Sequence, residues 1–466
     1  MSIYRLFNGA YRDYARSDKV LGQLNIIILS AAIGTFLFAA QGGVAFTGYA
    51  SALGAGEFAF GLISALPVLA GLMQIYVSHL AVKTGKYKHM FLIGGIIQRI
   101  SWIVIAFIPY MFPVEYSRLW SLIVLVTLAA MAGSYVGITH TTLMGSVIPI
   151  DIRGRYITTR QKVSMVVSLI AGLCFAFLLD FVPGFLGYTI VFAFGGVAGL
   201  IDILMYIKVD FSGIPHKPGD TSLIKGMRAC FTSKTMRNYL LFWTFWIFAI
   251  NISGPFFNKY AIDVLSLSYI SIIIFGQIAA QTAAFLIISR WGRFLDKYGS
   301  VPMLMISTMA STTLAFVWLF AVPGSIWPMF VFNLFGGLFW CANDAGMVNM
   351  QLSHTPSENR TPALAVYAVF TSIAAAAALI LGGAMLEILS PVMARADITF
   401  LGTQFDHYKL VFCIAIAVRY TVAAIFLPRV WNEKEMKLRE AYSKLYSDLG
   451  SRIKYARSEL RLRRRK

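Results

Sequence analysis

Two stretches of the sequence, FLFAAQGGVAFTGYA at 36–50 and FAINISGPFFNKYA at 248–261, each place one amide and one helix-weakening pair inside an apolar segment. The amides are Gln41 and Asn251, and the pairs are Gly42-Gly43 and Gly254-Pro255. Glycine and proline weaken a helix, and an amide without a partner is costly in hydrocarbon. Because the chain repeats both features in the same order, we expect the two matching positions to serve the same purpose.

The composition places the chain in a membrane. Hydrophobic residues make up 58% of the sequence and charged residues 13%, whereas a soluble domain has about 25% charged residues. Twelve apolar runs are readable, each with the roughly 20 residues that a spanning helix needs: 22–48, 59–80, 90–110, 120–147, 160–180, 185–207, 238–260, 267–289, 301–321, 327–350, 362–387 and 408–428. The sequence therefore predicts an all-α polytopic membrane protein with twelve transmembrane helices.

The first apolar run, 22–48, is too long for the core of a cleavable signal peptide, so it is expected to remain as a membrane helix. The four cysteines are scattered without metal-like spacing, which favours packing roles over disulfides, and we expect neither a metal nor a cofactor. No GxxxxGK[ST] loop is present, so ATP is not expected to drive the protein directly.

The positive charge is distributed by side. Of 40 Lys and Arg residues, 34 fall in the two termini and in alternate loops, which predicts that both termini are cytoplasmic in a cell (plasma or inner) membrane. The tail 429–466 alone carries 13 of them and is expected to form a helix that lies on anionic lipid headgroups or serves as a solvated, topology-setting segment. Because the positive charge lies in the termini and in alternate loops, the net charge of +19 does not indicate a nucleic-acid partner.

The chain divides into two similar halves. The longest internal connection separates the expected six-helix bundles, with segments 1–21 (N-terminus), 22–207 (first bundle), 208–237 (central loop), 238–428 (second bundle) and 429–466 (tail). PIDIRGR from Pro149 faces PSENRTP from Pro356, and Asp180 faces Glu387 at the same offset of 207 residues. These matches predict a duplicated six-helix unit.

Two loop motifs resemble the major facilitator superfamily of secondary transporters. WGRFLDKYG from Trp291 matches G-x-x-x-D-R/K-x-G, and PIDIRGR resembles the second conserved loop of that family. The resemblance covers residues 20–428 and implies the twelve-helix fold of two pseudo-symmetric bundles. It also implies a cytoplasmic gate, whose expected residues are Lys83, Gly85, Asp151, Arg153, Gly292, Asp296, Lys297, Gly299, Glu358 and Arg360. The copy after span two, AVKTGK, departs from the pattern because Val82 replaces the acid, which weakens the expectation of a latch in the first half.

In a transporter built from repeats, interrupted helices at matching positions mark the substrate path. We therefore expect a water-filled cavity lined by six polar or aromatic residues, with helix–helix hydrogen bonding or lipid-facing bulk as the alternative for each: Gln41, Asn251, His140, Asn343, Gln277 and Trp246. Asp344 is the acid well inside the second half, and an intramembrane carboxylate is a functional candidate. We expect it to titrate during transport, with His140 as the second candidate. Arg99 and Asp202 lie at similar depth and are expected to form a structural ion pair, with an anion site as the alternative.

These features favour a secondary active transporter of a small solute that works by alternating access, is coupled to protons and takes up a polar nutrient such as a sugar. Span five lacks the G-P-x-x-G-G-like run of the family's proton-coupled drug exporters, although an exporter of a drug or metabolite remains the alternative. A non-transporting membrane sensor is a further alternative. The six dispersed histidines give no catalytic or metal-binding pattern, so no enzyme is expected.

Overall fold

The computed structural model describes residues 18–148, 152–210, 223–355, 360–396, 398–400 and 402–430. Helices dominate the described chain. The first half contains α2 (Asp18–Gln41), α3 (Gly43–Ala52), α4 (Glu57–Ala70), α5 (Met73–Thr84), α6 (Tyr87–Met111), α7 (Glu115–Val147), α8 (Arg153–Phe181), α9 (Phe185–Met205) and the 3₁₀ turn η3 (Tyr206–Lys208). The expected tail 429–466 and N-terminus 1–21 lie almost wholly outside the described residues.

The second half begins within the segment expected to be a loop, since helix α10 occupies Leu223–Thr232. It continues with α11 (Lys234–Asn251), α12 (Phe256–Asp263), α13 (Tyr269–Ser271), the π-helical turns η4 (Ile272–Ile278), α14 (Ala279–Tyr298), α15 (Ser300–Leu314), the 3₁₀ turns η5 (Ala315–Phe320), α16 (Trp327–His354), α17 (Arg360–Ala396) and α18 (His407–Val430). A small antiparallel pair, β1 (Thr399–Phe400) and β2 (Thr403–Gln404), joins the last two helices.

The described residues form eleven helical segments that are long and apolar enough to cross a membrane. The expected tenth span, α16, is a continuous helix of 28 residues that packs along α14 and α15. Its Asn333, Asn343 and Asp344 lower its hydropathy below that of the other spans. Large apolar side chains such as Phe285 (74% exposed) and Phe181 (66% exposed) face outward, where a bilayer would cover them. The all-α fold predicted from composition is confirmed.

The first and seventh spans are both broken where the sequence predicts a break. Helix α2 ends at Gln41 and α3 begins at Gly43, whose φ of 63° lies in the left-handed region that glycine adopts without strain. Helix α11 ends at Asn251, and α12 begins at Phe256 after the turn that contains Gly254-Pro255. Each amide is therefore the last residue of a half-helix.

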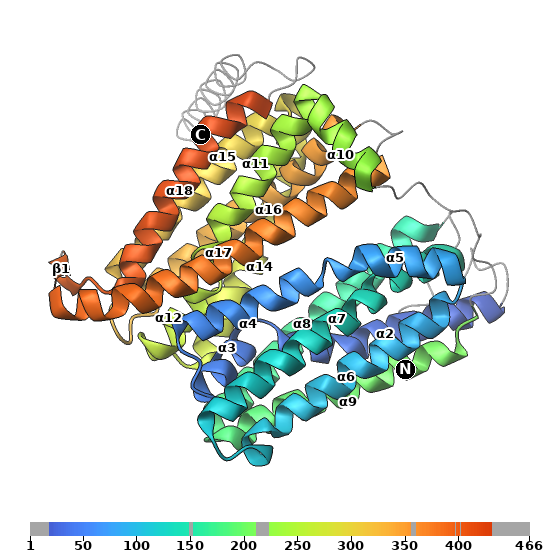
Figure 1. Cartoon of the computed structure of the whole chain (residues 1–466), viewed down its shortest axis with the longest axis horizontal. Coiled ribbons are helices and arrows are strands. Elements are labelled where there is room, and N and C mark those ends of the chain that lie inside the picture. Colours follow the sequence, from blue (N-terminus) through green and yellow to red (C-terminus); the bar gives the residue numbers. More distant parts are fainter. Residues whose placement is uncertain are drawn as a thin grey trace, which may run out of the picture.

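The helices of the two halves lie together at one end of the molecule and diverge at the other, as Figure 1 shows. We call the divergent end the basic end because its helix ends carry Lys83, Lys86, Arg290 and Arg293, and the other the closed end. At the closed end α3 contacts α12, α4 contacts α17, and α8 contacts α13. Contacts between the halves are thus concentrated away from the basic end.

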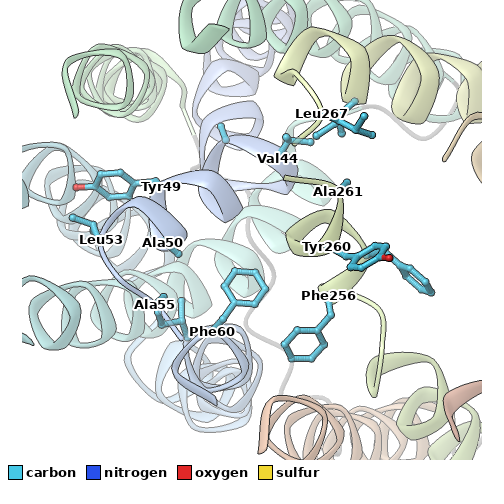
Figure 2. Close-up of a cluster of buried hydrophobic side chains, with 14 of the residues drawn as sticks. Val44, Tyr49, Ala50, Leu53, Ala55, Phe60, Phe256, Tyr260, Ala261 and Leu267 are labelled. Atoms are coloured by element: carbon cyan, nitrogen blue, oxygen red, sulfur yellow. The ribbon is translucent and has the colours of Figure 1, made fainter. Parts of the chain in front are cut away.

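An apolar layer fills the closed end (Figure 2). Figure 2 shows Phe60 of α4 and Phe256 of α12 facing each other across the two halves, and their ring centroids lie 5.8 Å apart in an edge-to-face arrangement. Tyr49, Tyr260 and Leu267 belong to the same buried cluster. This layer separates the interior of the molecule from the space beyond the closed end.

Candidate functional site: a cavity between the two halves

Three adjoining cavities lie beneath the apolar layer, and the ring of Phe38 lines all of them. The interface cavity has a volume of about 400 Å³ and is lined from both halves, by α2, α3 and α8 on one side and by α12, α13, η4 and α16 on the other. Its polar side chains include Asn258, Gln277 and Asn333. Amides can donate and accept hydrogen bonds, so this surface suits a ligand rich in hydroxyl groups.

A second cavity, the Gln41 cavity, has a volume of about 610 Å³ and lies mainly in the first half. Gln41 and Gln98 line it together with the ring of Trp102, and Pro255 and Asn258 enter from the second half. Asn258 therefore contacts both the Gln41 cavity and the interface cavity. The broken segments of spans one and seven meet here, as a repeat transporter requires of its substrate path.

The third cavity, the Arg160 pocket, has a volume of about 600 Å³. It is lined by Arg99, His140, Arg160, Asp202 and Tyr206 of the first half and by Gln281 of the second. His140 Nε2 lies 3.1 Å from the Tyr206 hydroxyl and 3.5 Å from Arg160 Nη2. Most of the charged side chains that line the three cavities belong to this pocket.

Of the six residues expected in the cavity, Gln41, Gln277 and His140 line one of these three cavities. The Asn251 amide instead donates to the Ile247 carbonyl on its own helix, at 2.8 Å. Asn258, seven residues further along the same broken span, holds the position that the sequence suggested for Asn251.

Two other residues that were expected to line the cavity, Trp246 and Asn343, are instead buried in the protein interior. Trp246 is 1% exposed and stacks on Phe242 within an apolar cluster. Asn343 is 2% exposed and bonds two serines of α15: its Oδ1 accepts from Ser307 at 2.9 Å, and its Nδ2 donates to Ser311 at 3.3 Å. Neither lines any of the three cavities, and these contacts favour packing roles for both.

Asp344 is exposed and follows Asn333 by eleven residues on α16. Eleven residues are close to three helical turns, so the two side chains share one face of the helix. Asn333 lines the interface cavity, which directs this face toward the first half. Asp344 thus lies about 16 Å nearer the basic end, and it lines none of the three cavities.

The structure contains the expected pair of Arg99 and Asp202. Arg99 Nη2 lies 3.2 Å from Asp202 Oδ2, and the two residues are 2% and 7% exposed. The Ser30 hydroxyl donates to the other carboxylate oxygen, and Arg99 Nη1 donates to Gln98 Oε1 at 2.5 Å. The pair joins α6 to α9 and, through Ser30, to α2.

The motif residues of the expected gate lie at the basic end. Gly85 ends α5 with a φ of 65°, next to the exposed Lys83. Gly292, Asp296 and Lys297 lie in the last turns of α14, which continues to Tyr298, so the motif expected in a loop is helical up to Gly299. Apart from the neighbouring residues of α14 itself, no atom of the described chain lies within 4 Å of a Cβ built on Gly292, so this glycine makes no close approach to another helix in this conformation.

The remaining gate residues are less fully described. Arg153 and Arg360 are the first residues of α8 and α17, and Asp151 and Glu358 lie outside the described residues. Among the residues that the structure describes, no group of three or more His, Cys, Asp or Glu side chains could hold a metal ion.

Polar contacts across the closed end were not anticipated as a functional feature. The carboxylate of Asp180 accepts from the backbone N–H groups of Tyr269 and Ile270, both at 2.8 Å. Glu387 Oε2 accepts from the Phe58 N–H at 2.9 Å. Asp180 lies at the end of α8 and Glu387 lies nine residues before the end of α17, and each acid caps the start of the second span of the other half. Their matching offset of 207 residues was the sequence signal for this symmetry.

Lys259 adds a third polar contact at the closed end. Its Nζ, on the second half, donates to Asp263 at 2.6 Å and crosses to the first half, where it donates to the Ser51 hydroxyl at 3.2 Å and the Ala55 carbonyl at 3.1 Å. The Tyr408 hydroxyl donates across the same boundary to Glu57 Oε1 at 2.6 Å. Such bonds between two rigid bundles can break and reform as units.

The comparisons with known proteins agree with this architecture. Residues 265–441 match the sequence profile of the family described as Major Facilitator Superfamily, and no curated protein matches the chain. The fold resembles that of the nucleoside transporter NupG, with a TM-score of 0.66 at 13% identity over 90% of this chain and 100% of that one. It also resembles a D-xylose-proton symporter (TM-score 0.64, 15% identity, 88% and 99% covered). A third similar structure is a bacterial homologue of the human lysosomal transporter Spinster, inward-facing and unoccupied (TM-score 0.62, 13% identity, 90% and 100% covered).

Proposed function

We propose that this chain is a major facilitator superfamily transporter that carries a small polar solute by alternating access, a proposal that the profile match of residues 265–441 and the similar folds support. The observation that carries the proposal is the interface cavity, which both halves line directly beneath the closed end. A solute held there touches both bundles, so rocking one bundle against the other would expose it to opposite sides in turn.

The distribution of positive charge indicates to which side of the membrane the cavities open. The basic end collects the lysines and arginines of the described loops, and positive loops remain cytoplasmic. The conformation described here is then inward-facing, with the apolar layer of Figure 2 as the closed outer gate. The expected gate motifs of the basic end would engage in the opposite state, in which Gly292 would lose its open surroundings.

The solute is proposed to be hydroxyl-rich, and its uptake to be coupled to protons. Asn258, Gln277 and Asn333 offer both donors and acceptors around one cavity, which suits a sugar-like ligand. The similar structures include a D-xylose-proton symporter and a nucleoside transporter. Asp344 is the proposed proton acceptor because it is a carboxylate within the expected tenth span, on the same helix face as the cavity-lining Asn333, and His140 is the second candidate.

A reconstitution experiment tests the coupling. Liposomes that contain the purified protein and an internal pH-sensitive dye receive D-xylose, uridine, D-glucose or D-glucuronate from outside. The proposal expects at least one solute to acidify the interior, and Asp344→Asn to retain solute entry while it abolishes the acidification. Acidification that persists in Asp344→Asn, while His140→Gln abolishes it, would transfer the role to His140. If both variants retain acidification, neither residue is the proton acceptor.

Alternating access is tested without a known solute by single cysteines placed at the two ends. Ser168→Cys reports on the cavities from the basic end, and Ala261→Cys reports on the closed end. Conditions that raise labelling at one position should lower it at the other. Labelling that never changes at either position would support a static sensor instead.

A further inference from the structure

The Arg160 pocket holds more positive than negative charge. Arg99 and Asp202 neutralise each other at 3.2 Å, which leaves the guanidinium of Arg160. Throughout the described part of the chain, no acidic side chain forms an ion pair with Arg160. A half-buried cation in a cavity of about 600 Å³ is unusual unless a ligand or water satisfies it.

The neighbours of Arg160 position its guanidinium, and the one carboxylate among the described residues of the pocket, Asp202, is already paired with Arg99. Arg160 lies on α8, three turns before Gly172 of the interface cavity, and its Nη2 is 3.5 Å from His140 Nε2. His140 Nε2 also lies 3.1 Å from the Tyr206 hydroxyl, so the imidazole links the guanidinium to the end of α9. The Arg160 Nε is enclosed by protein and has no hydrogen-bond partner among the residues that the structure describes.

The second half contributes to the same pocket. Gln281 of α14 lines it, and within the described part of the chain the enclosed Gln281 Oε1 has no hydrogen-bond partner. Ser168 lines both this pocket and the interface cavity, and Phe38 lies between them. The pocket is therefore continuous with the path of the solute and lies on the side toward the basic end.

We propose that the Arg160 pocket binds an anionic group, a carboxylate or a phosphate, of the transported solute. This proposal rests on the proposed transport function and narrows the solute to a hydroxyl-rich acid or phosphate ester. The planar guanidinium of an arginine matches the oxygens of either anion. The amides of the interface cavity would hold the hydroxyl-bearing remainder. The headgroup of an anionic lipid offers the same chemistry, so the experiment distinguishes lipid from solute.

The test uses the full chain with its four cysteines replaced by serine and Ser168→Cys as the reporter. Methanethiosulfonates that are anionic (sulfonatoethyl), cationic (trimethylammonioethyl) and neutral (hydroxyethyl) label it from the basic end in detergent. Arg160→Gln is expected to lower the ratio of anionic to cationic labelling rates by about three- to tenfold, the effect of one unit charge at roughly 5–10 Å in a partly aqueous cavity. Arg160→Lys should keep the ratio within about twofold of the parent, which separates loss of charge from misfolding.

Ligand protection is the second arm. Inorganic phosphate and D-glucuronate should slow labelling by the neutral reagent, whereas D-glucose, the uncharged counterpart of glucuronate, should slow it less. Arg160→Gln should remove the difference, and the matched control Lys162→Gln, an exposed cation two residues further along α8, should leave it intact. Slower labelling in nanodiscs of phosphatidylglycerol than of phosphatidylcholine, without added solute, would identify a lipid headgroup as the anion.

The proposal is overturned if Arg160→Gln leaves the rate ratio unchanged, or if neither anion nor anionic lipid protects Ser168→Cys. Alternating access would stand in either case, since it is judged by opposed labelling at the two ends. Loss of that opposition, with anion protection retained, would instead reject the transport proposal and leave an anion-binding pocket.

Discussion

At the scale of single residues, the buried pair of Arg99 and Asp202 carries the strongest stability argument. Breaking a buried ion pair leaves an uncompensated charge, which destabilises a protein by about 3–5 kcal/mol. Asp202→Asn should therefore lower the thermal unfolding midpoint of the purified protein clearly, as followed by intrinsic fluorescence in detergent. Asp296→Asn, an exposed acid of the gate motif, is the matched control and should change stability by about 0.5 kcal/mol or less. Equal midpoints for the two variants would contradict a structural role for the pair.

The sequence predicts some site residues and misplaces others, for a physical reason. Gln41 lies just before the break in its span and lines a cavity, as expected. Asn251 lies at the matching point but turns back to the Ile247 carbonyl, and Asn258 beyond the break takes its place. A break changes the direction of the next half-helix, so helical spacing cannot be continued across it. Likewise, polarity alone does not distinguish Asn343, bonded inside its bundle, from an amide that lines a cavity.

Arg160 illustrates the opposite error, since it lines a cavity although the sequence did not indicate it as a site residue. In the sequence it belongs to a group of basic residues at the start of a span and is explained by membrane topology alone. The structure places it against His140, which comes from a different helix. Only the packing of α7, α8 and α9 reveals that this cation faces a cavity rather than the membrane surface.

At the scale of helices, the crossing of α4 and α17 depends on two facing glycines. A Cβ on Gly61 would lie 2.6 Å from the Leu379 carbonyl oxygen and 3.2 Å from the Cα of Gly383, so any side chain there forces the helices apart. Gly61→Val should disfavour the closed end by about 1–3 kcal/mol and shift the population by about five- to a hundredfold. Labelling of Ala261→Cys from the closed end should rise. Gly22→Ala, where a Cβ meets no atom within 4 Å, is the control and should leave labelling unchanged.

Helix capping by two carboxylates also stabilises the closed end. Asp180 and Glu387 accept N–H bonds at the start of a span in the opposite half, where the helix dipole favours negative charge by about 0.3–1 kcal/mol. Asp180→Ala and Glu387→Ala should each shift the equilibrium toward opening of this end by about two- to fivefold, and together by the product of the two. Glu115→Ala removes an acid from a helix start within one half and should have no such effect. A double variant no more open than either single variant would show that the two caps do not act independently.

At the scale of the whole molecule, the structure joins a layer that closes one end to a path that widens toward the other. The apolar layer and the polar contacts of Lys259, Asp180 and Glu387 all lie at the closed end, and the described residues of the expected gate motifs lie at the basic end. The duplication explains why both halves contribute alike to the closed end, since each half supplies one carboxylate cap and one broken helix. The described bundles are rigid bodies of packed helices, so loss of contacts at one end is expected to bring the other end together.

This reciprocity gives the last prediction. Spin labels at Lys86→Cys and Lys297→Cys measure the distance between the halves at the basic end, and labels at Glu115→Cys and Arg395→Cys measure it at the closed end. In the Gly61→Val background, the first distance should shorten as the second lengthens, because the same helices connect both ends. The fractions of molecules in the shifted populations should agree for the two label pairs within experimental error, since one equilibrium governs both. A lengthened closed-end distance with an unchanged basic-end distance would mean local fraying of α4 and α17, and the halves would not move as units.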